Sequence, residues 1–329
     1  MNAQALVWRG LVGLCLVALV GCAPPAKQLL FSSDQDGDAE LFLLDMSDRI
    51  SRQLTENAVT DYAASWSPDG RQMAVSSDVG IVILDLEGQI LAELTPEGRL
   101  ANGPSWSPDG KSLVFYGTMA GNFEIYKADA SLQNIVRLTN TADVDESCPL
   151  WSPDGEHIAF VGHPDTFGFH LYVMNSDGGE IEGPIFVWAD TGFVCPAYAW
   201  SPDGQQLALA SYGLYLTAAP NFALSDQLAA CARGRPDWSP DGRLIVYAGD
   251  DCTRGEADIF VIGADGSDQR KLTDDQFDDS KPVWSPAGDA VAFLANHDIY
   301  LINADGTDRR RLIADIATNH ELSWRPLGR

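Results

Sequence analysis

Acidic residues alternate with other residues near the start of the chain, in a spacing that could bind a hard cation. The segment 34–40 reads Asp-Gln-Asp-Gly-Asp-Ala-Glu. Ca²⁺ prefers several oxygen ligands, and carboxylates arranged around a glycine could supply them. The segment lacks the twelve-residue spacing of an EF-hand, and Asp and Gly are also expected in a hairpin turn. The two interpretations are therefore a plain hairpin and a calcium site formed by Asp34, Asp36, Asp38 and Glu40.

A second set of acidic residues recurs five positions before a repeated tryptophan. This position is Asp61, Glu146 and Asp279 in three repeats, and Asp145 and Asp278 stand beside two of them. The chain has a formal net charge of −26, which disfavours nucleic acid and favours a basic protein or peptide as the partner. We interpret these five residues as a binding site for such a partner. The alternative is that they cap local turns.

The N-terminal residues have the pattern of an exported lipoprotein. Arg9 precedes an apolar run that is too short to span a bilayer but suits a signal peptide. The run ends in Leu-Val-Gly-Cys at 19–22, which resembles a bacterial lipobox, so Cys22 is the expected lipidation site. We expect a signal peptide at 1–21 and a lipidated cysteine with its tether at 22–27. The protein would then lie in the cell envelope, on the periplasmic face of the outer membrane or the outer face of the plasma membrane.

Export would also determine the state of the remaining cysteines. An oxidising compartment favours disulfide bonds, and four cysteines allow three pairings. The sequence does not choose among these pairings, and it has no CxxC or Cys/His spacing typical of a zinc site. The four residues are Cys148, Cys195, Cys231 and Cys252.

One sequence unit recurs along the chain and predicts the fold. Its tryptophans are spaced 38 to 49 residues apart, and they are Trp66, Trp106, Trp151, Trp200, Trp238, Trp284 and Trp324. Five of them begin the sequence Trp-Ser-Pro-Asp-Gly, the sixth has Ala287 in place of the aspartate, and the last keeps only the proline and glycine. Pro, Asp and Gly in this order suit a tight hairpin with a bulge. An apolar strand, a third strand and an outer strand ending in Leu-Thr follow in several units.

A period in this range is typical of the four-stranded blades of a β-propeller. The apolar strands suit sheets that are buried on both faces, as in stacked blades. Residues 29–55 carry three strands without a tryptophan strand, and residues 320–329 carry a tryptophan strand alone. Both ends of the chain would therefore form one blade and leave no sheet edge open. The prediction is an all-β, seven-bladed propeller over residues 28–329, with six blades as the alternative.

These repeats resemble the WD40-like repeat of the TolB family, over nearly the whole mature chain. The sequence departs from TolB in lacking its N-terminal α/β domain and in having seven blades rather than six. The resemblance implies a non-catalytic, monomeric propeller whose channel mouth receives a segment of a protein partner. Neither the composition nor the repeats identify that partner.

Enzymes also contain this repeat, so the repeat alone does not distinguish a binding module from an enzyme. Prolyl oligopeptidase-type enzymes need a Gly-x-Ser-x-Gly elbow, which the sequence lacks, as it lacks HExxH and Walker A motifs. His163 and His170, with Asp165 between them, are the histidines that lie close in sequence. We expect a protein without catalytic residues and with no cofactor other than the calcium considered above. The enzymatic alternative is a metal-dependent propeller-fold lyase or hydrolase acting on a polysaccharide.

Overall fold

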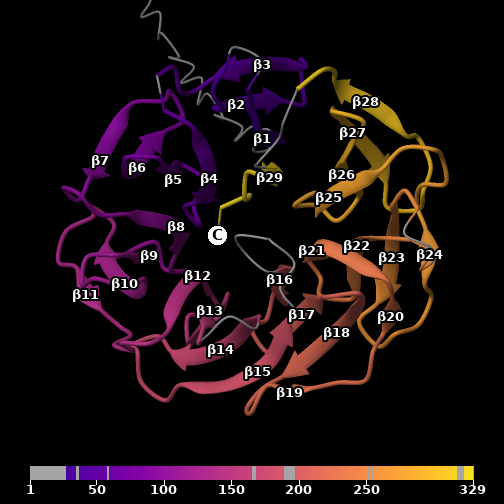
Figure 1. The fold of residues 1–329 in the computed structure, drawn as a ribbon. Helices are drawn as coiled ribbons and strands as arrows, with labels where there is room; N and C mark the ends of the chain where they lie inside the picture. The colour runs from indigo at the N-terminus through magenta and orange to yellow at the C-terminus, as the bar shows by residue number, and fades with distance from the viewer. Residues whose placement is uncertain are drawn as a thin grey trace, which may run out of the picture.

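Seven antiparallel β-sheets are arranged around a common axis (Figure 1). The computed structural model describes residues 27–34, 37–57, 59–164, 168–188, 197–250, 252, 255–316 and 322–328. Within these ranges the chain forms 29 strands and no helix, and so no helix that could cross a membrane. The all-β, seven-bladed prediction is confirmed, and the six-bladed alternative is wrong.

The blades are numbered in chain order, and their strands are given from the axis outward. Blade 1 consists of β29 (Leu322–Trp324), β1 (Gln28–Ser33), β2 (Glu40–Asp45) and β3 (Ile50–Gln53). Blade 2 consists of β4 (Asp61–Trp66), β5 (Gln72–Ser77), β6 (Gly80–Asp85) and β7 (Ile90–Leu94). Blade 3 consists of β8 (Ala101–Trp106), β9 (Ser112–Gly117), β10 (Glu124–Asp129) and β11 (Val136–Arg137).

The remaining four blades follow the same order. Blade 4 consists of β12 (Asp145–Trp151), β13 (His157–His163), β14 (Phe169–Asn175) and β15 (Glu182–Trp188). Blade 5 consists of β16 (Ala197–Trp200), β17 (Gln206–Ala210), β18 (Gly213–Ala218), β19 (Ala223–Leu224) and β20 (Ala229–Ala230), the last of which also pairs with β18. Blade 6 consists of β21 (Ala232–Trp238), β22 (Leu244–Gly249), β23 (Asp258–Gly263) and β24 (Arg270–Lys271). Blade 7 consists of β25 (Asp279–Trp284), β26 (Ala290–Ala295), β27 (Asp298–Asn303) and β28 (Arg310–Ile313).

Blade 1 is built from both ends of the chain, as the sequence predicts. The C-terminal strand β29 pairs with β1, with Leu29 opposite Trp324 and Phe31 opposite Leu322. This pairing supplies the innermost strand that the N-terminal segment lacks, so the ring closes without a missing strand.

The Trp-Ser-Pro-Asp-Gly segments form the turns that link the first two strands of each blade. In blade 2 the Ser67 hydroxyl donates to Asp69 Oδ1 (2.7 Å) and accepts the Gln72 backbone N–H (2.9 Å). Gly70 takes φ +66°, which glycine adopts without strain. In blade 7, which lacks the aspartate, the Ser285 hydroxyl donates to Asp289 instead (2.6 Å). The turn is therefore preserved by a carboxylate two positions later.

The tryptophans fill the space between neighbouring blades. Six of them are 4–8% exposed, namely Trp106, Trp151, Trp200, Trp238, Trp284 and Trp324. Trp200 packs with Ala159 and Val161 of the preceding blade, and its indole N–H donates to the Leu150 carbonyl there (3.1 Å). Trp238 and Trp324 donate in the same way, to the Ala199 (3.2 Å) and Val283 (3.4 Å) carbonyls. The indole N–H groups of Trp106, Trp151 and Trp284 are buried without such a partner, so apolar burial is what these boundaries share.

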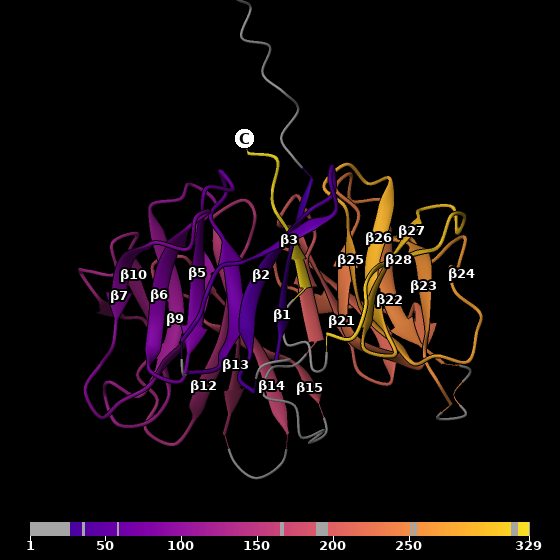
Figure 2. The ribbon, with the colours of Figure 1, turned by 90° about the horizontal axis from the view of Figure 1, so that it is seen from above.

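The propeller has two different ends. The innermost strands finish at the tryptophans, so all the Trp-Ser-Pro-Asp-Gly turns lie at one end, called here the turn face. The opposite end, where the innermost strands begin, is called the loop face. Lys27 pairs with Asp289 (2.6 Å), and the Arg325 backbone N–H donates to the Gln28 carbonyl (2.9 Å). The first and last described residues therefore lie on the turn face, where Figure 2 shows the C-terminal end.

A disulfide bond joins Cys231 to Cys252, with the Cα atoms 5.3 Å apart. It ties the residue before β21 to the loop that follows β22 in the same blade. Cys148 is also disulfide-bonded. Of the three pairings that the sequence allows, the structure is compatible only with the one that contains Cys231–Cys252.

Ring closure gives the first testable prediction. Deleting residues 322–329 removes β29 and exposes the edge of β1, so the protein should aggregate or lose its cooperative melting transition. The milder change Trp324→Ala should lower the free energy of unfolding by roughly 3–5 kcal/mol, the usual cost of truncating a buried aromatic residue. Both effects can be measured by chemical denaturation and light scattering. Deleting only residues 327–329 keeps β29 and serves as the control. Unchanged cooperative unfolding without β29 would contradict the closure.

Candidate functional site

Three blade boundaries on the loop face share one arrangement, called here a carboxylate clasp. It consists of an acidic residue at the start of a third strand, a threonine just after the fourth strand, and an acidic residue at the start of the next innermost strand. The clasps are Glu40–Thr55–Asp61 between blades 1 and 2, Glu124–Thr139–Glu146 between blades 3 and 4, and Asp258–Thr273–Asp279 between blades 6 and 7. The Leu-Thr ends of the outer strands, seen as a recurring pattern in the sequence, thus have a structural role.

The clasp between blades 3 and 4 shows the geometry. The Thr139 hydroxyl lies 2.7 Å from Glu124 Oε2 and 3.3 Å from Glu146 Oε2, and it accepts the Ile125 backbone N–H (2.8 Å). The Glu146 backbone N–H donates to the Phe123 carbonyl in the preceding blade (2.9 Å). Arg137 pairs with Glu124. Two buried carboxyl groups from different blades are therefore joined through one hydroxyl group.

Burial changes the acidity of these groups. It raises the pKa of Glu146 to about 8, and the neighbouring Glu124 charge adds to the shift, although the Thr141 hydrogen bond opposes it. Burial also raises the pKa of Asp279 to about 7 and that of Asp61 to about 6. Burial acts in the same direction on Glu124, but hydrogen bonds from Thr139 and Arg137 outweigh it and lower the pKa of Glu124. The clasp between blades 3 and 4 thus pairs a protonated carboxyl group with an ionised one near neutral pH.

The structure separates the five residues predicted to bind a partner. Asp61, Glu146 and Asp279 are 2%, 2% and 0% exposed, because their side chains turn into the clasps. Their assignment as contact residues on the surface needs correction, since side chains this deeply buried cannot touch a partner. Asp145 and Asp278 are exposed on the loop face. Each also accepts a backbone N–H, from Phe123 (3.0 Å) and Ala257 (2.8 Å), so the turn-capping alternative describes part of their role.

Asp145 also lines an open hollow of about 480 Å³ on the loop face, between blades 3 and 4. The Asn122 side chain holds one wall of it by donating to the Thr141 (2.7 Å) and Val144 (2.9 Å) carbonyls. Its lining residues are Asn122, Ala142, Asp143, Val144, Asp145, His163 and Pro164. Ordered backbone thus presents two carboxylates beside an imidazole, a surface that suits a basic side chain.

The candidate calcium segment is only partly described. Asp36 lies outside the described residues, while the Asp34 carbonyl accepts the Gly37 backbone N–H (3.1 Å) in a turn. Glu40 is drawn into the first clasp, where its Oε1 accepts the Asn57 backbone N–H (2.7 Å). Asp34, Asp38 and Glu40 do not bring three ligand atoms within 4.8 Å of one another. Calcium binding here stays a prediction, as does lipidation of Cys22, which also lies outside the described residues.

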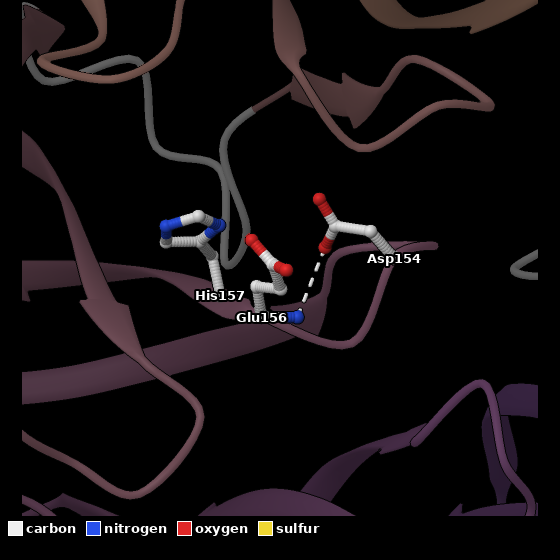
Figure 3. Close-up of side chains that lie close together, drawn as sticks. All are labelled: Asp154, Glu156 and His157. Carbon is white, nitrogen blue, oxygen red and sulfur yellow. Dashed lines mark hydrogen bonds between the residues drawn. The ribbon is translucent and has the colours of Figure 1, made fainter.

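A different group of side chains does bring metal-binding atoms together. The described residues contain one such group, Asp154, Glu156 and His157, whose ligand atoms all lie within 4.8 Å of one another (Figure 3). It lies on the turn face, where the Trp-Ser-Pro-Asp-Gly turn of blade 4 leads into β13. The sequence signal was available: a glutamate and a histidine follow the turn glycine in this repeat alone. The spacing of the histidines does not reveal this group, because its other two donors are carboxylates.

The raised pKa of Glu146 gives a prediction about pH. A carboxyl group whose pKa is higher in the folded than in the unfolded state makes the protein less stable as pH rises between the two values, from about 4.5 to about 8. Glu146→Gln keeps the shape of the side chain and cannot ionise. The free energy of unfolding of this variant, relative to that of the wild type, should therefore increase as the pH rises through this range. Urea denaturation at pH 5, 6.5 and 8.5 measures the difference, for which one pKa unit corresponds to about 1.4 kcal/mol.

The control for this experiment is Asp145→Asn, which changes the exposed neighbouring residue. Its stability relative to the wild type should show little change with pH. If Glu146→Gln and Asp145→Asn gave parallel curves, Glu146 would not be protonated in the folded protein.

Comparisons with known proteins agree with this fold. The family model described as eukaryotic translation initiation factor eIF2A matches residues 31–166, less than half of the chain. The Tol-Pal system protein TolB of Anaeromyxobacter dehalogenans is 25% identical over 188 residues, which are 51% of this chain and 42% of that protein. An uncharacterized peptidase of Bacillus subtilis, YuxL, is 40% identical over 57 residues, 17% of this chain and 8% of the peptidase. The chain thus spans less than half the length of the curated relatives it matches.

Solved structures extend the likeness over most of the chain. TolB from Acinetobacter baumannii superimposes with a TM-score of 0.57 at 19% identity, over 91% of this chain and 67% of that one. An oligogalacturonate lyase from Vibrio parahaemolyticus gives a TM-score of 0.65 at 18% identity, over 87% of this chain and 85% of the lyase. At this identity the likeness shows the fold, which binding proteins and enzymes share. The repeats, the sheet order and these relatives together show that the chain is a TolB-like β-propeller with seven blades.

Proposed function

We propose that this protein is a non-catalytic binding module that docks a basic segment of a protein partner on its loop face. The observation that carries the proposal is the acidic hollow there, with Asp143 and Asp145 held in place by ordered backbone. Asp278 adds an exposed carboxylate at another blade boundary. The likeness to TolB supports a partner-binding role in the envelope.

The position of the chain ends supports the choice of face. If Cys22 is lipidated, only the four residues 23–26 lie between the anchor and Lys27 on the turn face. An extended chain spans at most about 3.5 Å per residue. The turn face would then lie near the membrane, and the loop face would be directed away from it. The Cys231–Cys252 disulfide is compatible with an oxidising envelope compartment.

A polysaccharide lyase is the enzymatic alternative, because an oligogalacturonate lyase with this fold has been solved in complex with manganese. It predicts that a bound metal ion would be needed for cleavage of an anionic polymer. Incubating the protein and Mn²⁺ with oligogalacturonate tests this directly, since lyase products absorb in the ultraviolet. Cleavage would displace the binding-module proposal.

Docking on the loop face predicts a specific loss of partner capture. Asp145→Asn with Asp278→Asn removes two charges but keeps oxygens that can accept the Phe123 and Ala257 N–H groups. Association with the proteins captured from an envelope fraction should slow several-fold at low salt, and the difference should shrink at high salt because charges are screened. Surface plasmon resonance with the captured partner measures both rates.

The matched control carries two charge removals on the turn face, Glu87→Gln and Glu180→Gln, both at exposed positions. It should bind as the wild type does. If both double variants slowed association equally, net charge rather than the loop face would account for binding.

The anchor gives a separate prediction. Cys22→Ser removes the thiol that would carry the lipid, so the protein should leave the membrane fraction or accumulate unprocessed. Fractionation with mass measurement of the mature N-terminus distinguishes the two outcomes. A processed Cys22→Ser protein that stays in the membrane fraction would contradict lipid anchoring.

A further inference from the structure

We propose that Asp154, Glu156 and His157 form a binding site for a divalent first-row transition-metal ion of the Zn²⁺ class. Their ligand atoms lie within 4.8 Å of one another, close enough to share one ion. A combination of imidazole and carboxylate donors suits Zn²⁺ and its neighbours, whereas Ca²⁺ prefers oxygen alone. Figure 3 shows the Glu156 carboxylate between the His157 ring and the Asp154 side chain.

His157 has a feature that points to a bound ligand and that the two carboxylates lack. Its Nδ1 is buried and has no hydrogen-bond partner, although a buried polar atom without a partner is costly. The ring is held in place by Trp200, stacked at 6.4 Å between centroids, and by Phe222, edge-on at 5.3 Å. A metal ion would satisfy this nitrogen without moving the ring.

The aspartate is also fixed by its neighbours. Its Oδ1 accepts the Glu156 backbone N–H (2.9 Å), and its Oδ2 accepts the Gln205 side-chain amide from the next blade (2.9 Å). Hydrogen bonds of this kind orient ligands at metal sites and strengthen binding. Of the three side chains, only that of Glu156, which is exposed, would need to change its conformation to bind the ion.

The other blades show that the turn does not require these residues. At the position of Glu156 three blades carry a cation that pairs with the turn aspartate, namely Arg71 (3.9 Å), Lys111 (3.3 Å) and Arg243 (3.8 Å). The position of His157 is Gln72, Ser112, Gln206, Leu244 or Ala290 elsewhere. Blade 4 therefore has a carboxylate where three other blades have a neutralising cation, and it has an imidazole beside it. Five other blades form the same turn without this pair of residues, so the turn itself does not require them.

Three protein ligands would leave one position of a tetrahedral ion open. Because Asp154 and Glu156 are exposed on the turn face, that position is accessible to water or to a side chain of another molecule. The site is on the opposite end of the propeller from the proposed docking hollow, so it does not rest on the proposed function.

The test is Zn²⁺ binding by isothermal titration calorimetry, with the untagged protein in a buffer that does not bind metals. The wild type should bind one equivalent at its tightest site. His157→Gln and Glu156→Gln, which introduce residues found at these positions in blades 2 and 5, should each weaken that site at least tenfold. Zn²⁺ should also raise the melting temperature of the wild type more than that of either variant, because binding to the folded state stabilises it.

The controls are His170→Gln in the same blade and Glu87→Gln at another exposed position of the turn face, which should both bind as the wild type does. Glu156 is exposed, so Glu156→Gln should fold normally and decides the result if His157→Gln is unstable. Unchanged Zn²⁺ affinity in Glu156→Gln, or the absence of a tight site in the wild type, would overturn the proposal.

Discussion

The structure depends on the closure of a ring of sheets that are apolar on both faces. In blade 2, Met73, Ala74 and Val75 are successive residues of β5, and all three are fully buried although they point to alternate faces. Such a sheet needs a neighbour on each side, so a row of blades is stable only when the last one meets the first. The pairing of β29 with β1 completes blade 1 and places the first and last described residues at the same end of the propeller.

The sequence was sufficient to predict this architecture because the turn chemistry is local. Ser, Pro, Asp and Gly each shape the turn through contacts within the same six residues. The regular spacing of the tryptophans gives the number of blades. The environment of Asp61, Glu146 and Asp279 could not be predicted in the same way. Counting back from the tryptophan places them correctly at the start of an innermost strand, but their burial depends on a threonine and a third strand from the preceding blade. Those contacts join residues that the repeat period alone does not relate.

Differences among the repeats therefore carry more information than their common features. Two clasps contain a cation two residues before the threonine: Arg137 pairs with Glu124, and Lys271 pairs with Asp258 (2.8 Å). The clasp between blades 1 and 2 has the exposed, neutral Gln53 at this position, and amide groups of Asn57 contact Glu40 and Asp61 instead. Buried carboxylate oxygens without a hydrogen bond do not set this boundary apart, because they occur here on Asp38 and Glu40 and also between blades 6 and 7 on Asp279. The electrostatic balance of this boundary thus differs from that of the others, although the backbone pairing is the same.

The two faces of the propeller are under different constraints, and this explains where its distinctive residues lie. On the turn face each Ser and Asp is used by the hairpin itself, and adjoining turns touch: a Cβ on Gly110 would lie 3.7 Å from Pro68, and one on Gly288 3.4 Å from Pro240. In the five blades that keep the full Trp-Ser-Pro-Asp-Gly turn, variation falls on the residues just after the glycine, where Glu156 and His157 occur. On the loop face the connections between strands carry no such shared turn, so exposed carboxylates such as Asp143 and Asp278 can differ from blade to blade at little structural cost. The rigid turns of the turn face thus permit a cation-binding group, and the variable loops of the loop face permit a docking surface. Neither site requires the other to be present.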